Sequence, residues 1–381
     1  MKPINTINVS LTRRHWLMLA GATLMTGCGG GSNVVAALPV TGGTGSPLYA
    51  QGSISGFGSV IINNTKFDDL QAMVHIDGVA ATSADLRLGM VAIVQGLRGA
   101  DPTLGTANSI DVWSIAQGRI TRVSGSEFDV AGMVVLTNGN TTFDGLTDVA
   151  SLSVGQNVAV WGLQAGADGI QWQATRVAIV VGASSALVSS GLLTLAKGKR
   201  SLNGLTLTGT AVDSLADGQL VRVSGTPTQN NTLAVIGVKV LNASLQDQSQ
   251  GEVDIEAVVT SVLPNNHFMM GSIEVDVATF SASNVQVAVG MRLKVNGTWS
   301  GGVLVATQVS LEDDHTLVEI EAHVDQFTSL ANFVMRSQRC DASSAVFTNG
   351  TAANLKAGIK IKVKGIKAGD VLNVTSVEFD D

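Results

Sequence analysis

The sequence is poor in charge, in aromatic rings and in cysteine, and each shortage excludes a class of protein. Only 14% of the 381 residues are charged, against roughly 25% in an average globular protein, which disfavours long exposed helices. The aromatic residues are ten Phe, five Trp and one Tyr, and the net charge is −7. An acidic chain with few rings suits neither the phosphate backbone nor stacked bases, so we expect no nucleic acid partner.

Two cysteines, Cys28 and Cys340, are too few for a disulfide framework. The fold must therefore rest on a hydrophobic core. We interpret Cys340 as a half-buried strand residue and not as a reactive thiol, because no base is paired with it in the sequence. Glycine, by contrast, is abundant at 43 residues, and with Val, Thr, Ser and Asn it favours strands joined by tight turns.

The N-terminus has the features of a signal peptide, which we place at residues 1–27. Its apolar stretch, from Trp16 to Met25, is roughly half of what a bilayer-spanning helix needs. The segment around Arg13 and Arg14, Thr12-Arg13-Arg14-His15-Trp16-Leu17, resembles the twin-arginine export motif. Adjacent arginines also occur in signals of the general secretory route, so both export routes stay open.

The next residues resemble a bacterial lipobox, Met25-Thr26-Gly27-Cys28. The resemblance implies a lipid on Cys28 that anchors the protein in the cell envelope, and Gly29 is a residue type that usually permits sorting to the outer membrane, facing the periplasm or the cell surface. Residues 28–49, rich in Gly and Ser, are predicted to form a flexible tether. The alternative is ordinary cleavage, with Cys28 incidental.

The remaining chain repeats one pattern five times. Two glycines stand seven residues apart, with a valine five residues after the first and an apolar residue three after it, which predicts a strand with one buried face. We expect the flanking glycines to turn the chain. The glycine pairs and their valines are Gly89/Gly96 with Val94, Gly155/Gly162 with Val160, Gly218/Gly225 with Val223, Gly290/Gly297 with Val295, and Gly358/Gly365 with Val363.

Further strands are predicted on both sides of each glycine pair. A strand follows it with apolar residues three apart, at Ala107/Ile110, Ala174/Val177, Val235/Val238, Ala306/Val309 and Val374/Val377. A hairpin precedes it, around Asn63-Asn64, Ala131-Gly132, Asn203-Gly204, Gly271-Ser272 and Arg336-Ser337. Each repeat of about 65 residues then holds five or six short strands, enough for a small barrel.

We therefore predict an all-β fold: a tandem array of about five small β-barrel (OB-like) or sandwich domains after the signal peptide and tether. We expect the domains to follow one another as separate beads. Their predicted bounds are 50–114, 115–181, 182–243, 250–312 and 313–381.

The first repeat resembles a known family of domains of unknown function, family 5666. The resemblance lies in Gly56-Phe57-Gly58-Ser59-Val60-Ile61-Ile62-Asn63, then Phe67, then Asp77-Gly78, then Leu86-Arg87-Leu88-Gly89-Met90-Val91. It is closest in residues 50–114, fair in the second repeat and degenerate in the other three. Members are commonly exported bacterial proteins, often lipoproteins, with tandem small β-domains. The resemblance implies an envelope location and a fold, but no activity.

The richest cluster of possible metal ligands is a predicted strand with Glu319, Glu321, His323 and Asp325 on one face. Carboxylates beside an imidazole can hold a divalent ion. Successive ligands on one straight strand spread too far to surround one ion, so we interpret these residues as a solvated outer face and predict no metal and no cofactor. The same ligand-rich stretch begins earlier, with Glu312-Asp313-Asp314-His315, while His75 and His267 lie outside it.

Tryptophans offer the other candidate surface, since a sugar platform needs clustered exposed rings. We interpret Trp113, Trp161, Trp172 and Trp299 as single rings packed at the edges of barrels. No catalytic set of Ser, His and Asp can be assigned, so we expect a non-enzymatic envelope lipoprotein that serves as a scaffold, spacer or binding surface for an unknown envelope protein or polymer. A carbohydrate- or polymer-binding module is the alternative, and an enzyme is the third hypothesis.

Overall fold

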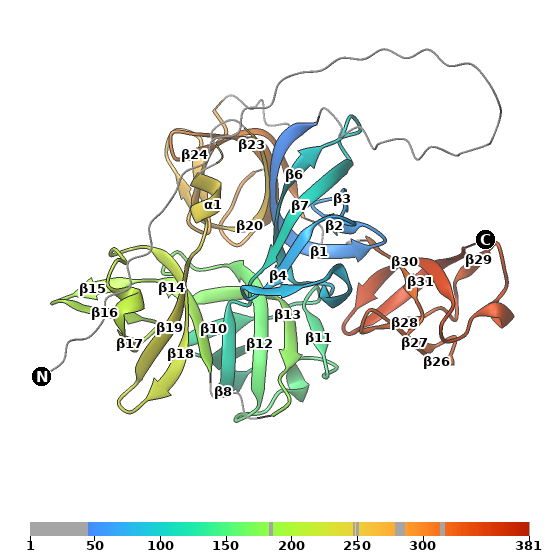
Figure 1. The fold of residues 1–381 in the computed structure, drawn as a ribbon, viewed down its shortest axis with the longest axis horizontal. Helices are drawn as coiled ribbons and strands as arrows, with labels where there is room; N and C mark the ends of the chain where they lie inside the picture. The colour runs from blue at the N-terminus through green and yellow to red at the C-terminus, as the bar shows by residue number, and fades with distance from the viewer. Residues whose placement is uncertain are drawn as a thin grey trace, which may run out of the picture. The chain divides into compact units, whose positions relative to one another are not determined.

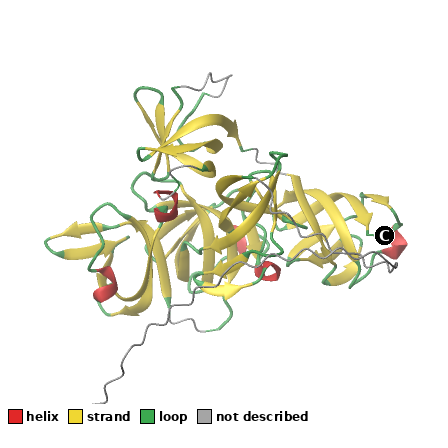
Figure 2. Ribbon diagram, turned by 45° about the horizontal axis from the view of Figure 1, so that its top comes forward, coloured by secondary structure: helices red, strands yellow, loops and turns green. Residues whose placement is uncertain are grey.

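The computed structural model describes residues 45–182, 186–246, 248, 251–278, 286–312 and 317–380. Strands dominate this part of the chain, and the helical segments are single short turns (Figure 2). The strands fall into five groups, one for each predicted repeat, which we call modules 1 to 5 (residues 46–112, 116–179, 187–240, 252–311 and 317–379). The signal peptide, Arg13, Arg14 and Cys28 lie outside the described residues.

Module 2 illustrates how each barrel closes (Figure 1). Its first strand pairs with both the second and the fourth long strand, and the fifth strand pairs with the fourth and, in parallel, with the third. A 3-10 turn, η2 (Val149–Ser151), precedes the fourth strand. The five strands are β8 (Ala116–Ser124), β9 (Glu127–Val130), β10 (Met133–Leu136), β12 (Asn157–Gln164) and β13 (Gln171–Ile179), and β11 (Thr142–Asp144) adds a short parallel strand beside β13.

The same closed order recurs in modules 1 and 4, and in modules 3 and 5 with the first strand divided in two. The OB-like barrel is therefore confirmed, and the described residues form no sandwich. Module 1 contains β1 (Ser46–Phe57), β2 (Val60–Ile62), β3 (Thr65–Asp68), β4 (Met73–Ile76), β5 (Val79–Ala81), η1 (Ser83–Asp85), β6 (Val91–Arg98) and β7 (Leu104–Val112). Module 3 contains β14 (Leu187–Leu192), β15 (Thr194–Ala196), β16 (Lys199–Leu202), β17 (Leu205–Thr208), η3 (Thr210–Val212), β18 (Leu220–Thr228) and β19 (Thr232–Val240), and the short helix α1 (Ala243–Gln246) follows it.

The last two modules keep the pattern. Module 4 contains β20 (Glu252–Leu263), β21 (His267–Met270), β22 (Ile273–Asp276), β23 (Arg292–Ser300) and β24 (Val303–Leu311). Module 5 contains β25 (Leu317–His323), β26 (Gln326–Ser329), β27 (Asn332–Met335), β28 (Gln338–Asp341), β29 (Val346–Thr348), η4 (Ala352–Asn354), β30 (Lys360–Ala368) and β31 (Val371–Phe379). Modules 1 and 5 therefore carry seven strands, more than the five or six expected.

The repeated valines form the centre of each core, as predicted. Val94, Val160, Val223, Val295 and Val363 are all 0% exposed. The first glycine of every pair has a positive φ, between 75° and 91°, and turns the chain into the fourth long strand, where a residue with a Cβ atom would be strained.

The second glycine of each pair does not turn the chain, so that part of the expectation is wrong. It lies inside the strand, opposite a β-bulge in the fifth strand. A Cβ atom there would come within 2.0–2.4 Å of a backbone oxygen of the bulged strand, so only glycine fits. The bulge inserts one extra residue, which is why the buried apolar residues stand three apart and not two. The extra residues are Asn108, Thr175, Ile236, Thr307 and Thr375.

All five predicted hairpins are present. Even the Arg336-Ser337 turn, which contains neither glycine nor asparagine, places both residues at positive φ (50° and 60°). A two-residue turn of this kind matches the twist of the paired strands, and this requirement overrides the side-chain preference at Arg336 and Ser337.

The expectation of separate beads needs correction, because strands pair between modules. β1 pairs in parallel with β20 of module 4 and with β25 of module 5, and β8 of module 2 pairs with β14 of module 3. β1 also begins at Ser46, inside the range assigned to the tether, and Leu48 and Tyr49 are buried. Within the residues described, no helix combines the length and the apolar character needed to cross a bilayer.

Candidate functional site

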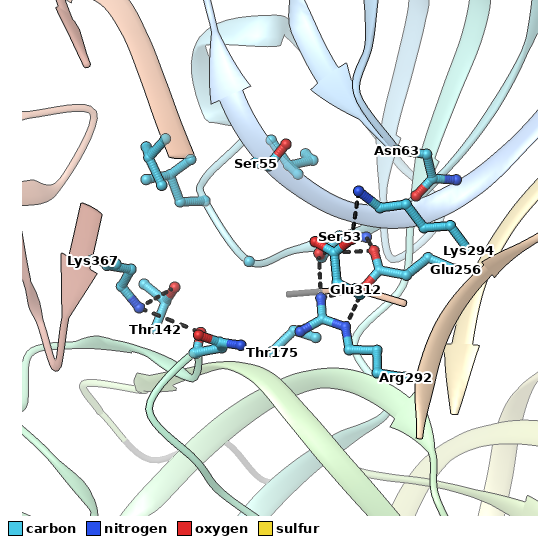
Figure 3. A pocket seen from close by; sticks show the side chains of 15 residues that line it. Ser53, Ser55, Asn63, Thr142, Thr175, Glu256, Arg292, Lys294, Glu312 and Lys367 are labelled. Carbon is cyan, nitrogen blue, oxygen red and sulfur yellow. Dashed lines mark hydrogen bonds and ion pairs between the residues drawn. The ribbon is translucent and has the colours of Figure 1, made fainter. Parts of the chain in front are cut away.

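Residues of modules 1, 2, 4 and 5 line a cavity of about 60 Å³ (Figure 3). One water molecule needs roughly 10–15 Å³ of such space, so there is room for a few waters or one small ion. β1 contributes Ser53 and Ser55, β23 contributes Arg292 and Lys294, and β30 contributes Lys367. Because these strands belong to different modules, packing of the modules creates the cavity.

A buried carboxylate forms one side of the cavity. Glu256 is 1% exposed and accepts hydrogen bonds from the backbone N–H of Ser53 (2.9 Å) and from its hydroxyl (3.1 Å). Arg292 pairs with Glu256 and also donates to Ser53 Oγ at 2.9 Å. The charge of Glu256 is therefore balanced by Arg292 of the same module, and both side chains also hydrogen-bond Ser53 of module 1.

A second ion pair lies beside the first. Lys294 Nζ is 2.5 Å from Glu312 Oε2 and 3.3 Å from Asn64 Oδ1 of module 1. Lys294 and Glu312 are both largely buried. The two carboxylates that line this cavity are thus each matched by a cation.

Lys367 stands at the opposite side of the cavity and has no such match (Figure 3). Its Nζ donates to Thr142 Oγ1 (2.8 Å) and to the carbonyl oxygen of Thr141 (3.0 Å), and lies 3.5 Å from that of Asn140. Among the described residues, no carboxylate is within ion-pair distance of Nζ. Burial, reinforced by the charge of Arg176, lowers the pKa of Lys367 to about 7.

Thr175 places an unused hydroxyl on the cavity wall. It is the extra residue of the bulge in β13, is 3% exposed, and its Oγ1 has no hydrogen-bond partner. A buried polar atom without a partner is unusual. Bulges often redirect a side chain next to a functional site, so Thr175 and Lys367 are the two residues that mark this cavity as a candidate binding site.

Arginines bridge modules elsewhere in the same way. Arg98 of module 1 reaches Glu252 (2.8 Å) and Asp254 (3.4 Å) of module 4, and burial raises the pKa of Asp254 to about 6, although the charge of Arg98 opposes this. Arg222 of module 3 pairs with Asp77 of module 1 at 2.8 Å. Each arginine and carboxylate of these two bridges therefore has a partner of opposite charge.

A second cavity, of about 80 Å³, is mainly apolar and is lined by Trp113 and Trp172. Gln164, which is 6% exposed, contributes an unpartnered Oε1, and Trp113 Nε1 also lacks a partner. The tryptophans do not form an exposed cluster: Trp161 and Trp172 are 6% and 4% exposed, and the Trp113 ring lies 5.3 Å from Arg222 and 5.2 Å from Lys239.

On the strand face with four possible metal ligands, the two glutamates form ion pairs with lysines. Glu319 contacts Lys66 (2.8 Å) and Lys362 (3.1 Å), and Glu321 contacts Lys360 (2.7 Å). Burial opposes ionisation of Glu319, but the hydrogen bonds and charges of Lys66 and Lys362 outweigh it and lower its pKa to about 2. These carboxylates are committed to lysines, and the predicted alternation of polar and buried residues in β25 is observed.

The remaining candidates are isolated from one another. His323 is exposed, His75 lies 3.4 Å from Asp111, and His267 lies between Glu274 and Asp276, while His315 is outside the described residues. Groups of three or more potential metal ligands are absent from the part of the chain that the structure describes. Cys340 is 1% exposed, deeper than expected, and burial raises the pKa of its thiol to about 12.

Sequence analysis did not identify Lys367 or Thr175. One signal was present: Lys360, Lys362 and Lys364 alternate along β30, and Lys367 breaks that period of two after the bulge glycine. A lysine that breaks the alternation points to a different side of the strand from the other three. The residues that it contacts, Thr141 and Thr142, belong to module 2, so the sequence around Lys367 does not identify them.

Comparison with known families identifies the modules. The model of the family described as Domain of unknown function (DUF5666) matches residues 117–178 and 256–310, which fall in modules 2 and 4. The resemblance in the sequence is closest in module 1, whereas the matched segments lie in modules 2 and 4. No curated protein matches the sequence. The second and fourth modules of this chain therefore match the DUF5666 family.

Proposed function

We propose that this protein is a non-catalytic scaffold or spacer of the bacterial cell envelope, held at a membrane, most simply the outer membrane, by a lipid on Cys28. The observation that supports a scaffold is the way the barrels are fastened together. A single strand, β1, pairs with strands of two other modules, β20 of module 4 and β25 of module 5. A chain of independent binding beads needs no such pairing, whereas a rigid spacer does.

Buried ion pairs support the same proposal. Asp254 of module 4 pairs with Arg98 of module 1, and the Glu256–Arg292 pair of module 4 hydrogen-bonds Ser53 of module 1; these charged groups are largely removed from solvent. Loss of one partner of a buried pair costs about 3–5 kcal/mol. Such pairs resist sliding of one barrel over another, because any shift would leave a charge buried without its partner.

The lipid anchor is tested by fractionation. In the native host, the Cys28→Ser variant should appear in the soluble fraction, while Cys340→Ser, which removes the buried thiol, should stay with membranes. Intact mass analysis of the wild type should show the added lipid. A Cys28→Ser variant that still sediments with membranes, together with an unmodified wild type, would refute the anchor. Changing Arg13 and Arg14 to Lys should block export only if the twin-arginine route is used.

The scaffold itself is tested by rigidity. Spin labels on exposed Thr307 of module 4 and exposed Asn108 of module 1 should give one narrow distance distribution in the wild type. The Arg98→Met variant, which leaves buried Asp254 of module 4 without its cation, should broaden this distribution. A broad distribution in the wild type would contradict a rigid spacer.

Carbohydrate or polymer binding is the second candidate, favoured by the cavity that Trp113 and Trp172 share with the unpartnered Gln164 Oε1. Tryptophan fluorescence in the presence of envelope glycans should change in the wild type and not in Trp113→Leu. A wild-type signal unaffected by any glycan would argue against this candidate.

A further inference from the structure

The side of the cavity that holds Lys367 has an excess of positive charge. Its Nζ contacts neutral oxygens, and the neighbouring Arg176 is already paired with Asp144. Buried charges in proteins are normally paired. The two carboxylates on the other side of the cavity are matched by Arg292 and Lys294, so neither supplies the missing counter-charge.

Thr175 is the residue that distinguishes module 2 from its repeats. At the equivalent bulge position, Thr307 of module 4 and Thr375 of module 5 are exposed and donate to the carbonyl oxygens of Asn296 and Lys364, both at 3.1 Å. Thr175 is buried instead and makes no such bond. Of these three equivalent threonines, only Thr175 lines the cavity, and only its hydroxyl has no hydrogen-bond partner.

Gly89 of module 1 packs tightly against this side of the cavity. A Cβ atom on Gly89 would lie 2.9 Å from Thr142 Oγ1 and 2.4 Å from the carbonyl oxygen of Thr175. Any other residue at position 89 would therefore clash with module 2 and push it away from module 1. The Lys367 contact to the Asn140 carbonyl oxygen, at 3.5 Å, is the longest of the three and leaves one N–H direction weakly used.

We propose that this corner of the cavity binds one small oxyanion, a carboxylate or phosphate group, held by the Lys367 ammonium and the Thr175 hydroxyl. Thr142 orients Lys367 through the 2.8 Å hydrogen bond. The anion supplies the missing counter-charge, and because the wall is built from modules 1, 2 and 5 its binding also clamps those modules. The proposal does not depend on the lipid anchor or on export, so it stands or falls separately from the proposed function.

The test uses the purified full chain and two probes, inorganic phosphate and glucuronate, each titrated at constant ionic strength adjusted with sodium chloride. Calorimetry should give one site per chain. Thr175→Val should weaken binding about tenfold or more, since a hydrogen bond to a charged group is lost, and Lys367→Met should abolish it. Phosphate binding alone would identify a phosphate source, and glucuronate binding alone an acidic sugar.

Two variants serve as matched controls. Thr375→Val makes the same substitution at the equivalent bulge of module 5, and Lys360→Met removes a partly exposed lysine from the same strand as Lys367; both should bind like the wild type. Thr175→Val should fold normally, because its hydroxyl has no partner in the protein. Failure of both probes to bind the wild type, or equal binding by wild type and Thr175→Val, would overturn the proposal.

Discussion

Replacing the second glycine of module 2, Gly162→Ala, should destabilise that barrel strongly. The new Cβ atom would lie 2.4 Å from the carbonyl oxygen of Gln173 and 3.2 Å from Cα of Ala174. The closest of these atoms is backbone oxygen of the paired strand β13 and cannot rotate away. Relieving the contact requires the two strands to separate by more than half an ångström, and overpacking of this kind costs about 1–3 kcal/mol.

Gly139→Ala is the control for this substitution, because it lies in the same module with no atom within 4 Å of the new Cβ and no positive φ. It should be neutral or stabilise by ~0.4–1 kcal/mol through the unfolded chain. Amide hydrogen exchange in β12 and β13 should speed up about 5- to 150-fold in Gly162→Ala, since each 1.4 kcal/mol is a factor of ten. Equal protection in the two variants would refute the close-approach explanation of the repeated glycine.

Three further predictions concern the cores, Lys367 and metal content. Val363→Ala leaves a cavity in module 5 and should cost roughly 1–3 kcal/mol, with exchange rising most in residues 317–379; loss of protection spread evenly over all modules would instead show one cooperative unit. Because burial lowers the pKa of Lys367 to about 7, below its ordinary 10.5, the unfolded chain binds the extra proton between these values, so stability should rise with pH from 7 to 10.5 by up to ~1.4 kcal/mol per unit. Lys367→Met should flatten that slope in denaturant melts, and an unchanged slope would contradict the assignment. Elemental analysis should find no stoichiometric zinc, copper or iron, and an ion that disappears in His323→Ala would overturn this.

The strands and their inward residues were predictable because the forces that define them act locally. A strand with one buried face alternates apolar and polar side chains whatever surrounds it, so the repeated valines marked five cores before any contact was known. Two-residue hairpins likewise depend on neighbouring residues alone. The spacing of three in the following strand was visible too, but its cause, a bulge opposite a glycine, became clear only from the pairing of strands.

Only the tertiary structure decided how the modules pack and which residues form the proposed anion site of Lys367 and Thr175. Lys367 and Thr175 are far apart in the sequence and come together only because module 5 packs against module 2. Local pattern also gave Thr175, Thr307 and Thr375 the same role, as bulge residues in equivalent strands. Of these three threonines only Thr175 is buried, so burial and not sequence position leaves its hydroxyl without a hydrogen-bond partner.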